Sequence, residues 1–125
     1  MLGLTMIKDY LNEILDGYKN YDARSYLTNK RGKIALIDSK NMRVYGTIEL
    51  IGCRKITAEE YCSWHKTGRF KNYIFEVEDK NKNHYAYDFK NPRKLINTIK
   101  VNVKKHTWVE IPNDLEMYYS DTLFQ

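Results

Sequence analysis

The chain has 125 residues and a formal net charge of +5, and 42% of its residues are hydrophobic. This length is typical of one domain, which buries enough surface to fold without a metal or a disulfide. The composition excludes wholesale disorder, and no apolar run approaches the ~20 residues of a membrane helix. Lys8 and Asp9 come too early for the apolar core of a signal peptide, so we expect a cytoplasmic protein without a membrane partner.

The first predicted helix spans residues 6–16. Thr5 is suited to cap its N-terminus, and Gly17 stands where a helix commonly ends in a left-handed residue. The apolar residues repeat at helical spacing and share one face, namely Ile7, Leu11, Ile14 and Leu15. The pattern therefore predicts an amphipathic helix that ends at Gly17.

Two strands are predicted next, over residues 34–38 and 43–51. Alternate residues of the second strand share one face, namely Val44, Gly46, Ile48 and Leu50. A glycine in the middle of a strand indicates a bulge or a bend, so we expect the sheet to curve at Gly46.

The second half of the chain begins with a predicted helix over residues 57–67, because Thr57 and Glu60 have the spacing of a capping box. Residues 112–125 form either a docked helix or a tail. Four strands are predicted between these two segments, over residues 73–78, 84–89, 95–103 and 107–111. Short strands dominate, which favours an α+β domain with a mixed or mostly antiparallel sheet.

Positive charge is concentrated in one segment. Residues 90–105 contain six cations and no acid. The charged residues after Lys105 are all acids. This asymmetry is typical of a face that contacts phosphate groups and equally of a surface that only keeps a protein soluble, so both interpretations stay open. The histidines have no partner at metal-ligand spacing, and we expect neither a metal nor a cofactor.

Three segments of the chain resemble the motifs of one domain family. Residues 14–24 include the end of the first predicted helix, then Gly17-x-Lys19, Asp22 and Arg24. Residues 44–51 and 85–95 resemble two later blocks, with the sequences VYGTIELI and YAYDFKNPRKL. Together these motifs resemble the ASCH family of the PUA-like superfamily. The resemblance implies an ASCH-like domain at 1–111 and a separate C-terminal segment at 112–125.

The resemblance implies a small, twisted, β-barrel-like sheet flanked by two or three helices. It also implies a partner, which is RNA or a modified nucleotide bound in a basic cleft lined by aromatic residues. The residues expected to bind it are Lys19, Tyr21, Asp22, Arg24, Tyr26, Arg93 and Lys94.

One branch of the family consists of amidohydrolases, which implies an alternative function. The reaction would be hydrolysis of an acylated nucleoside such as N4-acetylcytidine, with Lys19 as base or nucleophile and with Asp22 and Glu59 as further catalytic residues. In that branch a threonine stands three residues after the lysine, but here the position holds Asp22. Whether the chain is an enzyme therefore stays open.

Lys19 and its neighbours each have two interpretations. Loss of solvent in a cleft walled by tyrosines would disfavour the ammonium form of Lys19 and suit a base or nucleophile. A nearby Asp22 would instead keep Lys19 charged, as a ligand for phosphate or carbonyl oxygen. Asp22 and Arg24 point to one face of an extended segment. They form either a mutual ion pair or a carboxylate that orients Lys19 beside an arginine that binds phosphate.

The C-terminal segment gives a third hypothesis. Residues 115–124 are rich in aromatic and aliphatic side chains. They would either bind a protein partner or form part of the core of the domain.

Overall fold

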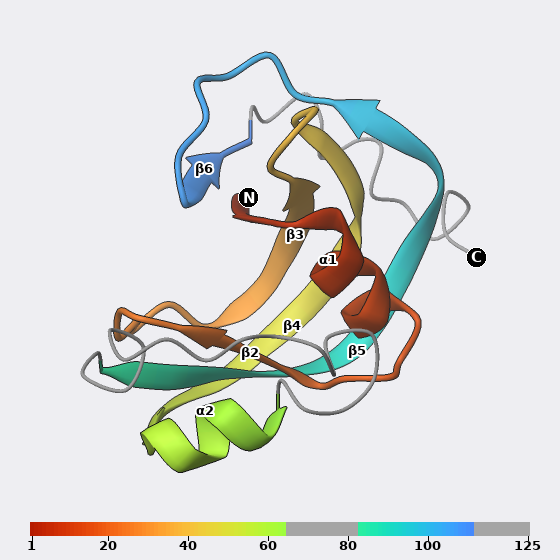
Figure 1. Cartoon of the computed structure of the whole chain (residues 1–125). Helices are drawn as coiled ribbons and strands as arrows, with labels where there is room; N and C mark the ends of the chain where they lie inside the picture. Colours follow the sequence, from red (N-terminus) through yellow and green to blue (C-terminus); the bar gives the residue numbers. More distant parts are fainter. Residues whose placement is uncertain (65–82, 112–125) are drawn as a thin grey trace.

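The computed structural model describes residues 1–64 and 83–111, except the side chains of Cys62 and Trp64. Within these ranges the chain forms strands and two helices (Figure 1). In chain order they are β1 (Leu2–Met6), α1 (Lys8–Leu15), β2 (Tyr21–Arg24), β3 (Gly32–Asp38), β4 (Arg43–Ile56), α2 (Ala58–Trp64), β5 (His84–Lys100) and β6 (Trp108–Glu110). Neither described helix is long and apolar enough to cross a membrane.

The strands form one 6-stranded mixed sheet in the order β2-β5-β4-β3-β1-β6. Neighbouring strands are antiparallel except β1 and β3, which run parallel. A mixed sheet with helices is confirmed, but the barrel-like closure is not, because β2 and β6 are the two open edges of the described sheet. Both edge strands are short, with 4 residues in β2 and 3 in β6.

Strand β5 differs most from the prediction. The sequence predicts two strands, at 84–89 and 95–103, but the chain continues through Asn91 and Pro92 as one strand. Asn91 has a positive φ of 54°, and the pairing of β4 with β5 changes register at several points along its length. Asparagine tolerates this conformation better than most residues, and register shifts bend a strand without ending it. Strand β5 therefore curves around the rest of the sheet (Figure 1).

The two helices begin differently. The predicted cap of α1, Thr5, lies in β1 instead, where its hydroxyl donates to the carbonyl of His106 at 2.9 Å. Helix α2 has the predicted capping box, because the Thr57 amide bonds the Glu60 carboxylate at 3.2 Å and the Glu60 amide bonds the Thr57 hydroxyl at 3.1 Å. The predicted helix end at 65–67, the strand at 73–78 and the segment 112–125 lie outside the described residues.

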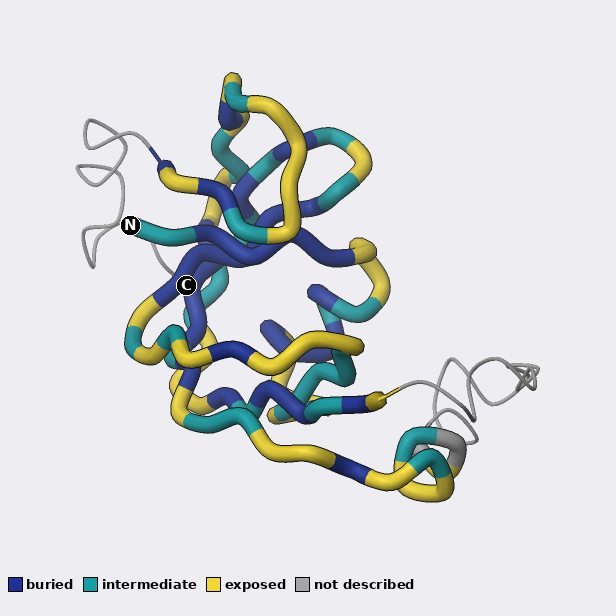
Figure 2. The backbone as a smooth tube through the Cα atoms, turned by 90° about the vertical axis from the view of Figure 1, so that its left-hand side faces the viewer, coloured by how far each residue is buried: buried dark blue, intermediate teal, exposed yellow. Residues whose placement is uncertain are grey.

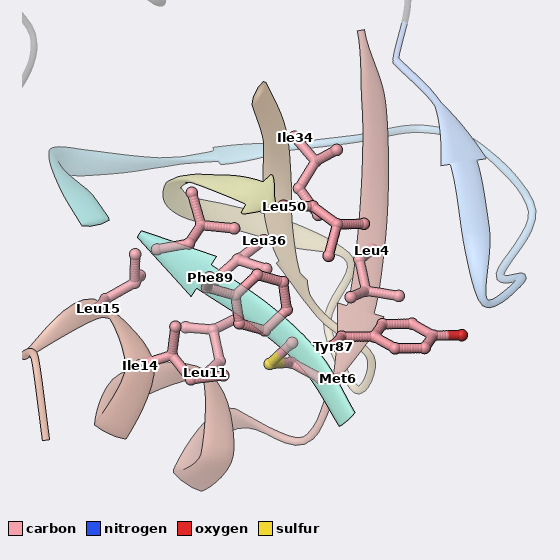
Figure 3. Close-up of a cluster of buried hydrophobic side chains, with 11 residues drawn as sticks. Leu4, Met6, Leu11, Ile14, Leu15, Ile34, Leu36, Leu50, Tyr87 and Phe89 are labelled. Atoms are coloured by element: carbon pink, nitrogen blue, oxygen red, sulfur yellow. The ribbon is translucent and has the colours of Figure 1, made fainter. Parts of the chain in front are cut away.

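Buried side chains fill both faces of the centre of the sheet. Along β3, Ile34 and Leu36 belong to one core cluster, and Ala35 and Ile37 belong to another. Helix α1 covers the first cluster, and its contacts there come from Leu11, Ile14 and Leu15 (Figure 3). The second cluster joins the curved end of β5 to the residues around β6, with Leu95, Val101, Val109 and Ile111. Exposed residues gather at turns and on α2 (Figure 2).

Gly46 allows α1 and β5 to approach β4 closely. A Cβ atom at this position would clash with the backbone carbonyl oxygen of Arg93 and would lie 2.9 Å from a methyl group of Leu15. The predicted irregularity is present, because the register of β4 against β5 shifts between Val44 and Gly46. Gly46 therefore sets how deeply the end of α1 packs on the sheet.

Replacement of Gly46 by alanine is expected to lower the free energy of unfolding by about 1–3 kcal/mol, because the backbone of β5 has to move. The matched control is Gly52→Ala on the same strand, where a Cβ would lie 3.7 Å from its nearest neighbour, in ordinary contact. Urea denaturation of both variants measures the difference. Equal stability of the two variants would contradict the close approach at Gly46.

Two buried threonines are expected to respond in opposite ways to replacement by valine. Thr47 is fully buried, and its hydroxyl has no hydrogen-bond partner in the part of the chain that the structure describes. Thr47→Val therefore raises the free energy of unfolding by about 1 kcal/mol, since a desolvated hydroxyl is removed. Thr5→Val lowers it by about 1 kcal/mol, because the bond to His106 is lost. Thermal denaturation of both variants tests the opposite signs, and a loss of stability in Thr47→Val would contradict the first.

Candidate functional site

The turn after α1 determines where Lys19 lies. Gly17 has a φ of 83°, as predicted for the residue that ends the helix. The amide of Gly17 donates to the carbonyl of Ile14 at 3.2 Å. The amides of Tyr18 and Lys19 both donate to the carbonyl of Glu13, at 2.9 and 3.2 Å. This is a Schellman motif, and it folds Lys19 back over Glu13.

Lys19 and Glu13 form an ion pair at the surface of the core. The Lys19 nitrogen lies 3.5 Å from a carboxylate oxygen of Glu13, and the two side chains are 18% and 7% exposed. The ammonium also lies 5.8 Å from the centre of the Tyr21 ring. Burial, and then the charge of Glu13, raise the pKa of the Tyr21 phenol above its usual 10.0. Tyr21 therefore keeps its proton at neutral pH.

A small hollow, called here the lysine hollow, adjoins this pair. Its volume is about 90 Å³. Tyr61 forms one wall, and its ring is stacked on the ring of buried His84, with ring centres 4.0 Å apart. The residues that line the hollow include Tyr10, Ile14, Lys19, Tyr21, Asp22 and Tyr61. A space of this size accepts a small polar group, since water occupies about 30 Å³ in the liquid.

Arg24 is held by two strands. Its Nε donates to the carboxylate of Asp22 at 2.5 Å, and a terminal nitrogen donates to the carbonyl of Thr5 in β1 at 2.8 Å. The side chains of Arg24 and Asp22 are 21% and 12% exposed. Of the two interpretations of these residues, the structure contains the mutual ion pair. The carboxylate paired with Lys19 is that of Glu13.

A second hollow, the central hollow, lies where β1, β2 and the segment before β6 meet. Its volume is about 330 Å³. It shares Tyr10, Asp22 and Ala23 with the lysine hollow, and Lys105 and Ser39 line its other side. The two hollows are therefore neighbours along β2.

A third and larger hollow lies between the two open edges of the sheet, and we call it the seam hollow. Its volume is about 640 Å³, and residues 24–30 line one side. Tyr87, Thr107 and Trp108 line the other side. It shares Arg24 with the central hollow. The three hollows thus follow β2 and the loop after it, from Lys19 to Lys30.

The indole of Trp108 forms one wall of the seam hollow. Its ring is stacked on that of Tyr87, with centres 6.4 Å apart and planes at 21°, and the Lys30 nitrogen lies 5.1 Å from its centre. The hydroxyl of Tyr87 donates to the carbonyl of Tyr26 at 2.7 Å, which fixes the loop after β2. Burial raises the pKa of Tyr87 above its usual 10.0, so this donor keeps its proton.

The structure brings five of the predicted site residues together around β2. Lys19, Tyr21, Asp22, Arg24 and Tyr26 all line one or more of the hollows. The other three predicted residues, Glu59, Arg93 and Lys94, line none of them. Glu59 is exposed on α2, and Lys94 pairs with Asp16 at 2.6 Å, which ties β5 to the end of α1.

Most cations of the segment 90–105 serve the fold or the surface. Lys90 pairs with Glu49 at 3.7 Å, and Lys100 donates to the carbonyl of Asn41. Of this segment only Lys105 lines one of the three hollows. Three of the six cations, Lys90, Lys94 and Lys100, thus have partners within the fold, and Lys105 lines the central hollow.

Sequence reasoning missed Glu13, Lys30 and Trp108 as site residues. A signal existed for Glu13, because a Schellman turn at Gly17 brings the third-last helical residue close to the residues just after the turn. No local pattern joins Lys30 to Trp108, which lie far apart in the sequence and are brought together by the fold. In the described residues, no group of three His, Cys, Asp or Glu side chains is placed to hold a metal ion.

Comparison with known proteins identifies the fold. No protein-family model and no curated protein matches the sequence. Among solved structures, the ASCH protein from Zymomonas mobilis aligns with a TM-score of 0.68 at 10% identity, over 99% of this chain and 95% of that chain. Two mutant forms of that protein align equally well, with 96% and 98% of their own chains covered. The chain therefore has the fold of an ASCH domain.

Proposed function

We propose that the protein binds RNA, or a modified nucleotide, along the three hollows beside β2. The observation that carries the proposal is their continuity, because each hollow shares lining residues with the next. A path of this kind suits an extended ligand with repeating units better than it suits one compact molecule.

The chemistry of the path supports a nucleotide chain. Each hollow has a cation in its wall, and Lys19, Lys105 and Lys30 supply one in turn. Aromatic rings accompany the cations in the lysine hollow and the seam hollow, with Tyr21 and Trp108 as the nearest. Cations for phosphates and aromatic rings for bases are the combination used by proteins that bind unpaired nucleic acid.

The charges along the path favour the central and seam hollows over the lysine hollow as the place for phosphate. Lys19 is compensated by Glu13 and Arg24 by Asp22. Lys30 and Lys105 form no ion pair with any residue that the structure describes. No described acid neutralises these two lysines, so they are the better candidates to bind a phosphate.

A second candidate function is hydrolysis of an acylated nucleoside in the lysine hollow. The observation in its favour is the amine of Lys19 beside the buried carboxylate of Glu13. Such a pair relays a proton while water adds to the acyl carbon and the C–N bond breaks, which leaves a carboxylate and a free amine. The expected partners are less favourable, because Asp22 is occupied by Arg24 and Glu59 is exposed on α2.

The binding proposal predicts a salt dependence that responds to Lys105. Log affinity for single-stranded RNA falls with log salt by about 0.7 for each phosphate contact. Lys105→Gln is therefore expected to weaken binding and to reduce this slope by about 0.7. The matched control is Lys55→Gln, since Lys55 is exposed and lines none of the three hollows. Fluorescence anisotropy with a labelled decamer measures both slopes.

Two results of that titration would contradict the proposal. One is no RNA binding by a folded wild-type protein at low salt. The other is an equal loss in Lys105→Gln and Lys55→Gln, because net charge alone would then explain the binding.

The hydrolase candidate predicts that the wild-type protein releases cytidine from N4-acetylcytidine. Lys19→Ala is then expected to reduce the rate at least 100-fold, in line with the loss of an acid–base group. Chromatography of the products measures release, and circular dichroism checks that the variant is folded. Undiminished release by Lys19→Ala, or none by the wild type, would rule this candidate out.

A further inference from the structure

The seam hollow exists because the sheet does not close. Its walls come from the loop 25–30 after one edge strand and from Thr107 and Trp108 at the other edge. At about 640 Å³ it is in the size range of small-molecule sites and is the largest of the three hollows described here. Its described lining includes two cations, Arg24 and Lys30, and no acid.

The walls of the seam hollow are held in place before any ligand binds. Tyr87, from β5, fixes the loop through its bond to the Tyr26 carbonyl. Within the loop, the amide of Lys30 donates to the hydroxyl of Thr28 at 3.2 Å, and Arg31 donates to the Thr28 carbonyl at 3.1 Å. A site that is already ordered loses less entropy when it binds.

Lys30 indicates what the hollow accepts. The Lys30 nitrogen lies 5.1 Å from the centre of the Trp108 ring. Because the ammonium group occupies this face of the indole, core atoms do not cover it. The lysine side chain is long and flexible, so it can leave the ring and exchange a cation–π contact for a phosphate contact. The indole face it uncovers is then available to a flat, aromatic ligand.

We propose that the seam hollow binds one unpaired nucleobase of single-stranded RNA, stacked on Trp108, with the adjoining phosphate bound by Lys30. The inference rests on the proposed function, and it specifies the strandedness of the ligand and the position of a base. Ser25, Asn29 and Thr107, which also line the hollow, supply polar groups for the edge of the base. Bases in a duplex are already stacked on their neighbours, so duplex RNA is excluded from this position.

The test uses the fluorescence of Trp108. The chain has 2 tryptophans, so Trp64→Phe leaves Trp108 as the only one. A single-stranded RNA decamer is expected to quench Trp108, because a base stacks on the indole. An abasic decamer with the same number of phosphates, a duplex of the same sequence and a nucleoside monophosphate are the comparison ligands. Quenching by the decamer at a concentration well below that needed with the other three supports the proposal.

Two variants test the contribution of stacking to affinity. Trp108→Leu keeps an apolar side chain against the core and is expected to bind the decamer roughly 10-fold or more weakly, whereas Trp108→Phe retains most of the affinity. The matched control is Tyr45→Leu, since Tyr45 has Lys8 5.7 Å from its ring centre but lines none of the three hollows. Thermal denaturation confirms that each variant is folded.

The outcomes separate this inference from the proposed function. If the decamer binds but neither quenches Trp108 nor distinguishes Trp108→Leu from the wild type, the stacking site is wrong and the binding proposal stands. Equal quenching by the abasic decamer, the duplex or the monophosphate overturns the assignment to an unpaired base of a strand. If no RNA binds, the proposed function itself fails.

Discussion

The contact of Arg24 with both Asp22 and Thr5 connects the strands around which the three hollows lie. Its guanidinium donates hydrogen bonds to the Asp22 carboxylate on its own strand and to the Thr5 carbonyl on β1. These bonds are charge-assisted and largely buried, so they are stronger than one neutral ladder bond. One side chain thus connects β2 to β1, whereas a ladder between β2 and β6 would have closed the sheet and filled the space. Hollows lie on both sides of Arg24 for this reason.

A second constraint acts on the helix side of β2. The left-handed Gly17 reverses the chain, and Gly46 lets the end of α1 sink onto β4. Together they bring the Lys19–Glu13 pair to the border between core and solvent. A partly buried cation without Glu13 would be costly, so the fold itself requires a carboxylate at this point. The pair therefore has a structural reason to exist whether or not it also performs chemistry.

Features that depend on residues close together in the sequence were predicted correctly. The end of α1 at Gly17, the capping box of α2 and the buried face of β4 follow from neighbours a few residues apart, and all three are confirmed. Asn91 and Pro92 lie between two strands that the sequence predicts separately, but pairing with β4 on both sides of them makes one continuous strand. The open sheet and the meeting of Lys30 with Trp108 depend on strand order. No short segment of sequence encodes strand order, so these features could not be predicted.

The distribution of compensated charge connects the fold to the proposed function. Lys94, Lys90, Lys19 and Arg24 each pair with an acid of the same chain. The first two pairs join different elements, the Lys19–Glu13 pair spans the turn after α1, and Arg24 pairs with Asp22 on its own strand. Cations used in this way are poor ligands for phosphate, because a ligand would have to displace the acid. Lys30 and Lys105 hold no acid among the described residues, and both face hollows beside Arg24. Under the proposed function, these two lysines would be the cations available to a phosphate, and Trp108 lies beside one of them.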